Sequence, residues 1–517
     1  MILIATILIG FVVFVVGLFW KHKDYWKSRG IKGPEPALFV GSILQLGDPN
    51  VVPHAFVHQK WTQEFGPIYG IQRGWTNVLI ISDVKMAHKL FNEQFDSFHG
   101  RDHPPLLGDP DKESISHVFM AQGSRWKRLR ALTSPVFSNK NLKKILPTIQ
   151  TCSETVVDRM SKELNEDNEL NIREFWREYA ADVIFRIAFD RKESPETLRK
   201  WADRMLAATS ESHSWYFKFT WIFPCLVRIV QVFRFCLIVF KHVSFLIFIR
   251  QLVAELRRRQ ADKKIADREE TESKDFIDFF MKSQSDDVRL DTNSSDTFDR
   301  HNVQVVKELS LMEVLGQLLI FLFAGFDTVA NALSFMTQFL VLNPEVQERL
   351  RTEIESVIGD ENPNYEQLNQ LKYTEAVIKE TLRIYPLAAA VNSRRCMKTT
   401  ELDGVKIEAG TDVIVDVVSV HRDPKLWGSD AEAFRPERWI DENSSIPQNA
   451  FFGFGSGFRQ CVGQRLGMIE LKMALIYLLR RYRLFKCPKT KFGDDHVVGF
   501  VLHPVDVVVR MERISDI

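Results

Sequence analysis

The chain opens on an unbroken apolar run. Residues 1–20 carry no charged side chain and are rich in Ile, Val, Leu and Phe. Twenty helical residues reach about 30 Å, the thickness of one bilayer core. A cleavable signal peptide is the competing interpretation, but neither a charged start nor a small-residue cleavage site precedes Lys21. The pattern therefore predicts a transmembrane anchor over residues 1–20.

Basic residues and helix breakers follow this run. Residues 21–32 hold five Lys or Arg side chains against one acid, Asp24. Positive flanks stay on the cytosolic side of a membrane. Gly and Pro between residues 30 and 36 interrupt any helix and stiffen the chain. We therefore expect a basic, proline-containing hinge over residues 21–36 and a cytosolic catalytic domain over residues 37–517.

Within this domain, helical periodicity dominates. Residues 67–82 alternate apolar and polar positions with β-branched side chains, which predicts a hairpin around Gly74. Residues 305–342 lack proline and are apolar nearly all round, which predicts a long buried helix that ends before Pro344. The fold class expected is mainly α with a small β subdomain. Further expected elements are a short helix at 276–281, short strands at 402–407 and 413–415, and a helix at 464–481.

Residues 215–250 combine aromatic and basic side chains without any acid, and Pro224 interrupts them. A second transmembrane span is possible, but the longest uncharged stretch, 219–227, is too short. A buried pair of helices is another possibility. Aromatic and basic residues without acids favour a segment that lies in the lipid headgroup region. The polar residues 261–301 that follow predict a solvated connection with a short helix inside it.

Composition narrows the function classes. The chain has 517 residues, 26% of them charged, and a net charge of +1, so bulk electrostatics does not indicate nucleic-acid binding. The six cysteines lack the repeated spacing of a zinc site or a disulfide scaffold, which suits a reducing compartment. There is no glycine-rich dinucleotide fingerprint after a predicted strand. Electrons for any redox reaction must then come from another protein.

One cysteine ends a glycine-rich loop with the pattern Phe-X-X-Gly-X-X-X-Cys-X-Gly, from Phe454 through Cys461 to Gly463. The glycines let a flat ligand approach the backbone, and Phe454 could cover one side of it. The helix expected after the sulfur would direct its positive end at a thiolate. A buried structural cysteine in a turn is the alternative. The full pattern favours a ligand-binding thiolate.

Three further constellations carry chemistry. Trp126 and Arg130 are four apart on one helical face and could bind carboxylates, although a basic surface helix with one buried Trp has the same spacing. An acid and a hydroxyl, Asp327 and Thr328, interrupt the apolar central helix near the small residue Ala324. Burying such polar groups costs free energy unless they form local hydrogen bonds, as at a helix kink, or have a function. In the third, Glu380 and Arg383 are three apart on one helical face, a spacing that ordinary exposed helices also have, and Arg438 could be a third partner.

In this order and spacing, the motifs over residues 30–510 resemble the cytochrome P450 family, most closely its microsomal drug- and steroid-oxidising branch (the family-3-like group). The resemblance implies the cytochrome P450 fold after one N-terminal transmembrane helix, with haem b (iron protoporphyrin IX) as cofactor and Cys461 as its axial thiolate. Asp327 and Thr328 would organise water and deliver protons, while Val329 departs from the Thr or Ser often found there. The implied cofactor-binding residues are Trp126, Arg130, Ala324, Phe454, Arg459, Cys461 and Gly463, and the implied structural triad is Glu380, Arg383 and Arg438.

The family often has a further propionate-binding arginine near the position where this chain has Ala388 to Ser393, and we assign that role to neither Arg394 nor Arg395. Substrate-pocket walls are expected from the 101–120 loop, residues 205–245, Phe321, Ala324, residues 389–392 and the 498–503 turn. The pocket should accept a lipophilic small molecule.

The resemblance further implies a single-pass protein of the endoplasmic reticulum membrane that contacts lipid and inserts one oxygen atom of O2 into its substrate. Its electrons would come from NADPH through a separate flavoprotein reductase, with cytochrome b5 as a further donor. Basic side chains near Cys461 could dock this reductase or be ordinary surface: Arg125, Lys127, Arg128, Lys140, Lys143, Lys144, Arg465 and Lys472. Two alternatives remain open, a haem-thiolate isomerase or dehydratase and a non-catalytic haem-binding sensor.

Overall fold

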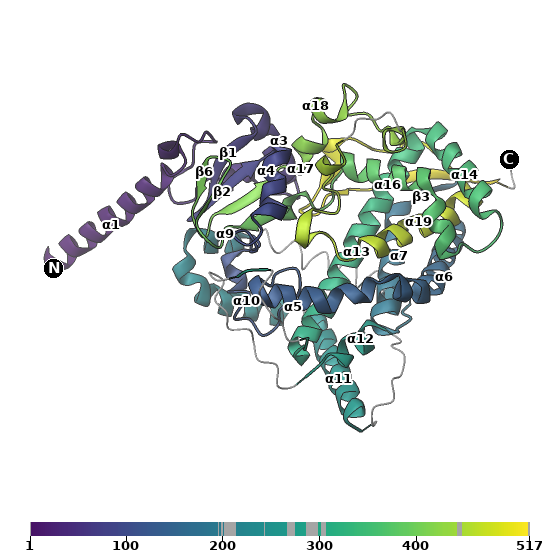
Figure 1. Cartoon of the computed structure of the whole chain (residues 1–517), viewed down its shortest axis with the longest axis horizontal. Coiled ribbons are helices and arrows are strands. Elements are labelled where there is room, and N and C mark those ends of the chain that lie inside the picture. Colours follow the sequence, from purple (N-terminus) through teal and green to yellow (C-terminus); the bar gives the residue numbers. More distant parts are fainter. Residues whose placement is uncertain are drawn as a thin grey trace.

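The computed structural model describes residues 2–194, 196, 197, 200, 214–241, 243–265, 275–285, 298–300, 307–441 and 447–514. Figure 1 shows a helical body from which α1 projects on the left, with β1 and β2 at its base and the C-terminus on the opposite side. The helices are α1 Ile2–Lys23, α2 Ile43–Leu46, α3 His54–Phe65, α4 Val84–His88, α5 Gly123–Thr133, α6 Asn139–Glu163, α7 Ile172–Phe189, α9 Trp215–Ile222, α10 Val227–Lys241, α11 Val243–Ile265, α12 Phe276–Lys282, α13 Leu311–Leu342, α14 Pro344–Ile358, α15 Tyr365–Gln370, α16 Lys372–Ile384, α17 Val417–His421, α18 Pro424–Trp427 and α19 Gln464–Arg481.

Within the described ranges, short strands form four small sheets. The largest has the order β1-β2-β7-β4, with β2 and β7 parallel, and a second has the order β3-β11-β8. Two further antiparallel pairs are β5 with β6 and β9 with β10. The predicted hairpin is confirmed, because β1 and β2 pair from Ile68–Ile81 to Arg73–Thr76 around Gly74. The strands are β1 Ile68–Arg73, β2 Thr76–Ile81, β3 Glu169–Asn171, β4 Ser393–Arg395, β5 Thr400–Leu402, β6 Val405–Ile407, β7 Asp412–Val415, β8 Tyr482–Phe485, β9 Val497–Val498, β10 His503–Pro504 and β11 Val508–Arg513.

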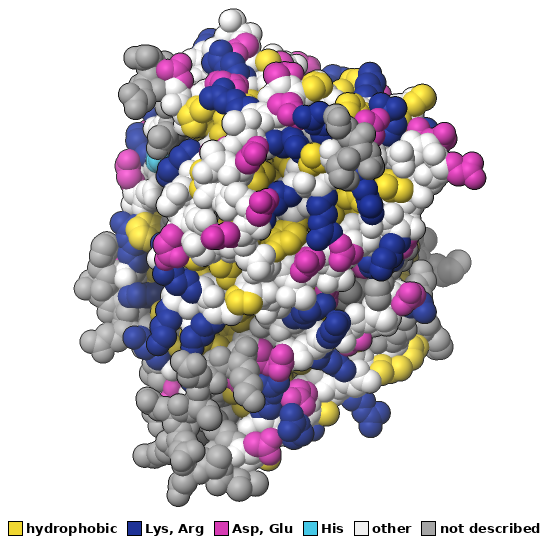
Figure 2. All heavy atoms as spheres, turned by 90° about the vertical axis from the view of Figure 1, so that its right-hand side faces the viewer, with side chains coloured by type: hydrophobic (Ala, Val, Ile, Leu, Met, Phe, Trp, Pro, Cys, Tyr) yellow, Lys and Arg dark blue, Asp and Glu magenta, His cyan; other side chains and the backbone are white. Residues whose placement is uncertain are grey.

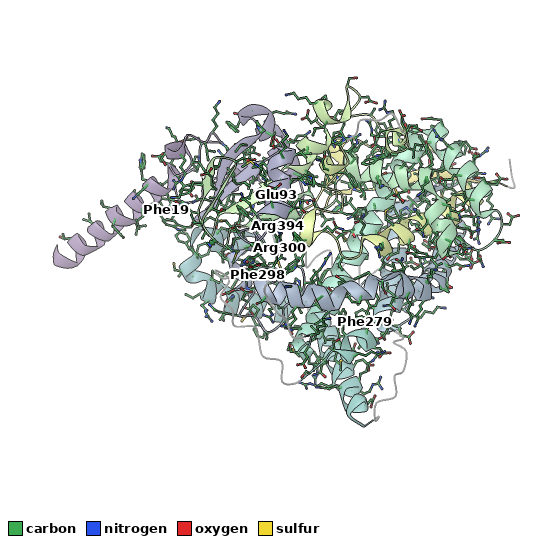
Figure 3. The ribbon with its side chains drawn as sticks, viewed as in Figure 1. Phe19, Glu93, Phe279, Phe298, Arg300 and Arg394 are labelled. Atoms are coloured by element: carbon green, nitrogen blue, oxygen red, sulfur yellow. The ribbon has the colours of Figure 1, made fainter. Side chains whose placement is uncertain are left out.

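The N-terminal helix α1 ends at Lys23, three residues beyond the end of the predicted anchor. Its described side chains Ile9, Val13 and Phe14 are largely exposed. The base of the helix is held against the sheet: Phe19, labelled in Figure 3, contacts the ring of Trp75. The C-terminal part of α1 is therefore packed against the body.

The hinge continues this docking. Trp26 is buried and its indole N–H donates to the Ile71 carbonyl of β1 over 2.9 Å. Gly70 allows this approach, since a side chain there would overlap the Trp26 ring. Arg29 pairs with Glu408 at 2.7 Å, which ties the hinge to a loop after β6.

The core is built around α13, which crosses the body (Figure 1). A capping box of Ser310 and Glu313 starts the helix, and it ends at Leu342 before Pro344, as predicted. The predicted start at residue 305 is too early, because the described residues 307–310 precede the helix; residues 305 and 306 lie outside the described residues. The helix α7 packs along α13, with Ile184 against Gly325 and the Trp176 indole donating to Thr337 over 3.0 Å.

Among the described residues, α13 is long and apolar enough to cross a membrane, and so is the bent pair α9–α10 when its two helices are taken together. Most of the apolar part of α13 is buried inside the body, so this helix belongs to the core. In the bent pair, the two helices meet at 118° where Pro224 interrupts the helical segment. The buried-pair possibility for residues 215–250 holds only in part, because Tyr216 and Trp221 are buried whereas Val232 and Phe235 are largely exposed; contact of this segment with lipid headgroups stays a prediction.

The face seen in Figure 2 carries interspersed basic and acidic side chains, with apolar ones between them. This mixture agrees with the net charge of +1. All six cysteines are free thiols.

Candidate functional site

A cavity of about 290 Å³ lies between α5, α13 and the glycine-rich loop before α19. One part of its wall is apolar, with Phe137, Phe276 and Phe321 in mutual ring contact. Another part is polar and carries several arginines. A ligand in this cavity would meet a charged edge, an apolar face and one thiol.

That thiol is Cys461. The loop folds back so that its backbone N–H donates to the Phe454 carbonyl over 2.9 Å, and α19 begins three residues after the sulfur. The side chain is accessible although it lies deep in the molecule, because it faces the cavity. Burial raises the pKa of the thiol, while the Gly463 N–H and the Arg130 charge lower it. Gly457 has a φ of +69° and touches the Phe91 carbonyl, so a side chain there would break the loop.

Four guanidinium groups line the same cavity: Arg101, Arg394 and Arg459, which are buried, and Arg130, which is partly buried. Figure 3 labels Arg394 near the middle of the body. Among the residues that the structure describes, no carboxylate lies within 4 Å of any of the four. Burial lowers the pKa of Arg101 to about 10 and that of Arg459 well below its usual value, and the neighbouring arginines lower the latter further.

Carbonyl groups satisfy these arginines only in part. Arg459 donates to the carbonyls of His99 at 2.6 Å and Ala121 at 2.5 Å, and Arg101 donates to that of Val391 at 2.6 Å. The Nε atoms of Arg101, Arg394 and Arg459 are buried without an acceptor. Concentrated buried positive charge is stable only with an anion beside it. The residues present therefore fit a ligand that carries more than one carboxylate, as haem does.

The other predicted cofactor-binding residues border this cavity. Trp126 lies on α5, four residues before Arg130, and the Arg459 guanidinium stands 4.9 Å from its ring. Phe454 and Gly463 line the cavity from the cysteine loop, and Ala324 lines it from α13. The structure thus brings together all seven residues that the sequence nominated.

The acid and the hydroxyl on α13 point in different directions. Thr328 lines the cavity and donates to the Ala324 carbonyl over 2.6 Å. Asp327 is not among the cavity-lining residues; its carboxylate accepts from the Asn331 amide over 3.1 Å. Burial raises the pKa of Asp327, and the Asn331 amide and two arginines of α7 lower it.

The predicted charge network also assembles. The Glu380 carboxylate accepts from Arg383 through two bonds of 2.9 Å and from Arg438 through one of 2.9 Å. It accepts further from the Trp439 indole and the Arg435 backbone, both over 2.9 Å. The three charged side chains have no exposed surface.

The predicted basic surface needs correction. Arg125 and Arg128 are buried and pair with Glu313 on α13 at 3.0 and 2.7 Å. Lys472 is also buried and donates to the Leu368 carbonyl over 2.8 Å. These three side chains are structural, because charges that face an inner partner cannot contact another protein.

The expected pocket walls hold in part. Val118, Phe119, Phe321, Ala324 and Val391 line the cavity, as expected from their segments. The 498–503 turn and the described part of 205–245 do not, and residues 205–213 lie outside the described residues. Arg101 also lines the cavity and lies in the expected 101–120 loop. The sequence did not indicate several other lining residues: Phe137, Ile184, Phe276, Ile320 and Arg394.

Comparisons with known proteins agree with this geometry. The family model described as cytochrome P450 matches residues 31–511. The chain is 37% identical over 518 residues to a Caenorhabditis elegans protein whose name calls it a cytochrome P450, CYP13A10; the match covers 99% of this chain and 98% of that protein. It is 37% identical over 490 residues to CYP13A2 of the same organism, with 94% of each chain covered, and 35% identical over 513 residues to CYP13A7, with 98% and 99% covered.

Proposed function

The chain belongs to the cytochrome P450 family of haem-dependent monooxygenases, and on that premise we propose that it inserts one atom of O2 into a lipophilic small molecule. The observation that carries the proposal is the cavity, in which an accessible thiol faces a cluster of arginines that have no carboxylate within 4 Å among the described residues. This arrangement supports haem b, whose iron the thiol would bind and whose propionates the arginines would bind.

In this proposal Cys461 is the iron ligand, and the positive end of α19 and the Gly463 N–H stabilise its thiolate. Trp126, Arg130 and Arg459 bind the propionates, together with Arg101 and Arg394, which the sequence did not nominate. Bound haem supplies the site of oxygen activation, where a thiolate ligand favours O–O cleavage. Phe454, Gly463 and Ala324 leave space for a flat group between them.

The proton chemistry falls to α13. Thr328 presents its hydroxyl to the cavity, and Asp327, one residue before it, holds a proton more readily than an exposed carboxyl does. Asp327 would supply protons that the Thr328 hydroxyl, with bound water, delivers. The ring cluster of Phe137, Phe276 and Phe321 would exclude bulk water and bind the lipophilic substrate. A drug- or steroid-like molecule suits an apolar cavity of this kind.

Membrane attachment is part of the proposal. The exposed apolar side chains of α1 and the basic hinge support a transmembrane anchor at residues 1–20 and a hinge at 21–36, with residues 37–517 in the cytosol. Figure 1 shows α9 and α10 on the same side of the body as the base of α1. The exposed apolar side chains of α10 would then rest on the lipid surface of the endoplasmic reticulum.

Electron supply would come from an NADPH-dependent flavoprotein reductase, with cytochrome b5 as a second donor. The basic side chains that remain exposed after the correction above lie on α6 and at the start of α19: Lys140, Lys143, Lys144 and Arg465. They are a fitting contact for an acidic partner.

Reconstitution with NADPH and reductase tests the proposal. A monooxygenase forms an oxygenated product only when both are present; an isomerase or dehydratase forms product without them, and a sensor forms none. Steroids, fatty acids and drug-like compounds would first be screened for a change of the haem spin state. Product formation without reductase, or none with any compound that binds, would contradict the proposal.

A further inference from the structure

A cluster of charged side chains with little exposed surface lies where the loop of residues 101–108 meets the largest sheet. We call it the charge latch, and it consists of Arg73 on β1, Asp102 and His103 on the loop, Arg395 on β4 and Asp412 on β7. Arg73 joins the loop to the sheet, because its guanidinium donates to Asp102 over 2.7 Å and to Asp412 over 3.2 Å. Arg395 binds Asp412 from the neighbouring strand through two bonds of 2.8 and 3.0 Å.

The loop that carries Asp102 separates the cavity from solvent. On the inner side Arg101, the preceding residue, lines the cavity and donates to the Val391 carbonyl over 2.6 Å. On the outer side the loop reaches the surface, where Leu107 is exposed. Movement of this loop away from the sheet would therefore open the cavity wall.

The sheet side of the charge latch is fixed. Asp412 lies on β7, which pairs with β2 on one side and with β4 on the other. The Arg73 guanidinium stands 4.6 Å from the Trp221 ring of α9. The Trp75 N–H at the hairpin turn donates to the Trp221 carbonyl over 3.1 Å, so α9 lies next to the hairpin (Figure 1). Asp102, in contrast, lies in no helix or strand, so the loop is the part of the latch that can move.

The two carboxyl groups of the latch share a proton. Asp102 accepts a hydrogen bond from the Asp412 side chain, and two ionised carboxylates have no proton to donate. Burial, and then the charge of Asp102, raise the pKa of Asp412 to about 7 against the two arginines. Two neighbouring imidazoles stay uncharged: burial lowers the pKa of His58 on α3 to about 3, and burial and then Arg395 lower that of His103.

We propose that the charge latch is a proton-operated gate of the cavity: one proton shared by Asp102 and Asp412 holds the loop against the sheet, and its loss releases the loop. Without the proton, two negative charges stand at hydrogen-bond distance in a buried site, and Asp102 regains its hydration when the loop moves out. Only a proton is transferred, from the carboxyl O–H bond to bulk water. The gate depends on the cavity and not on the reaction that takes place in it.

The direction of the pH effect follows from the two positions of the loop. In the closed position the pair keeps its proton up to about pH 7, whereas a solvent-exposed Asp102 ionises near pH 4. Opening therefore releases a proton at any pH between these values. The equilibrium constant for opening should rise with pH by up to about tenfold per unit and become constant above about pH 7.

Two substitutions in the pair should act in opposite directions. Asp412→Asn keeps a hydrogen-bond donor beside Asp102 but has no proton to lose, so the loop should stay closed at every pH. Asp102→Ala removes the group that Arg73 holds, so the loop should be open at every pH. Asp416→Asn is the matched control: Asp416 is also buried, directly after β7, burial raises its pKa, and it accepts from Thr62 over 2.6 Å.

Hydrogen exchange of the holoenzyme between pH 5 and 8, corrected for the intrinsic rate at each pH, measures opening without turnover. The reporter is the Arg395 N–H, which donates to the Gly100 carbonyl directly before the loop over 3.0 Å. Its opening constant should rise up to about a hundredfold from pH 5 to 7 in the parent and in Asp416→Asn. It should be independent of pH in the two latch variants, low in Asp412→Asn and high in Asp102→Ala.

Carbon monoxide entry is the second readout, because this ligand does not titrate. Its rate of binding to the reduced protein after flash photolysis should follow the same pattern among the variants. Exchange at Arg395 that ignores pH in the parent, or keeps its pH dependence in Asp412→Asn, would overturn the inference. Exchange at Arg395 as slow as that of the core amides of α13 would also overturn it, because the loop would then open only with global unfolding. A protein that bound no carbon monoxide would contradict the proposed function, while the exchange data would still decide on the gate.

Discussion

Replacing Glu380 by alanine removes the acceptor that two fully enclosed arginines share. Its carboxylate accepts five hydrogen bonds: three from Arg383 and Arg438, one from Trp439 and one from the Arg435 backbone, all at 2.9 Å. Breaking a buried ion pair by removing one partner costs about 3–5 kcal/mol, because an unpaired charge remains. Here two guanidinium groups lose their counter-charge.

Remaining contacts reduce this cost without cancelling it. Arg383 still donates to the His421 and Ala431 carbonyls, both at 2.6 Å, and Arg438 to that of Trp427 at 2.8 Å. We therefore expect a loss of about 5 kcal/mol, comparable with the whole stability of an ordinary domain. The chain should then accumulate with little bound haem.

The assay compares Glu380→Ala with Glu375→Gln. Glu375 lies on the same helix and is half-buried, paired with Lys379 at 2.8 Å and with the buried Lys472 at 3.3 Å. Glutamine keeps an oxygen acceptor for both lysines, so this change should cost about 1 kcal/mol. Haem bound per protein and the denaturant midpoint are measured for both. Full haem loading and an unchanged midpoint in Glu380→Ala would refute the structural role of the network.

Other residues give independent tests. Arg459→Met removes the charge-assisted propionate contact that we propose for this residue, so haem should dissociate roughly tenfold faster in a transfer assay; an unchanged rate would remove Arg459 from the cofactor site. Arg128→Ala should lower the free energy of unfolding by about 3–5 kcal/mol and leave the KM for the reductase unchanged. Lys144→Glu should raise that KM, most strongly at low salt, and barely alter stability. The reverse pattern would contradict the assignment of Arg128 to the interior and of Lys144 to the reductase-binding surface. Burial, and then the charge of Asp102, raise the pKa of Asp412 to about 7. The stability that its bound proton contributes is present below about pH 4 and is lost as the pH rises toward 7. Asp412→Asn should therefore flatten the dependence of Tm on pH between these values. An unchanged slope would count against the raised pKa of Asp412.

Local patterns made much of the fold predictable. The helix α19 begins and ends at the residues that periodicity indicated, and the hairpin turns at Gly74. Both depend on residues near one another in sequence, where spacing determines which face is buried. The cysteine loop and the Trp126–Arg130 pair could be nominated for the same reason.

Partners far apart in sequence could not be found in this way. Glu313, the ion-pair partner of Arg128, lies 185 residues later in the chain. Without this partner in view, the charge of Arg128 suggested an exposed side chain. Arg101 joins the cavity through a carbonyl 290 residues away, and no motif marks it. Which arginine faces solvent and which faces a buried anion depends on tertiary packing, which a charge pattern does not encode.

The central claim is that Cys461 is the thiolate ligand of haem in this cavity. The most direct measurement is the Soret band of the reduced, CO-bound protein, compared among the parent, Cys461→Ser and Cys225→Ser, whose cysteine lies exposed next to α10. The account predicts a thiolate-type band in the parent and in Cys225→Ser, and its loss in Cys461→Ser. A thiolate-type band that survives in Cys461→Ser would contradict it.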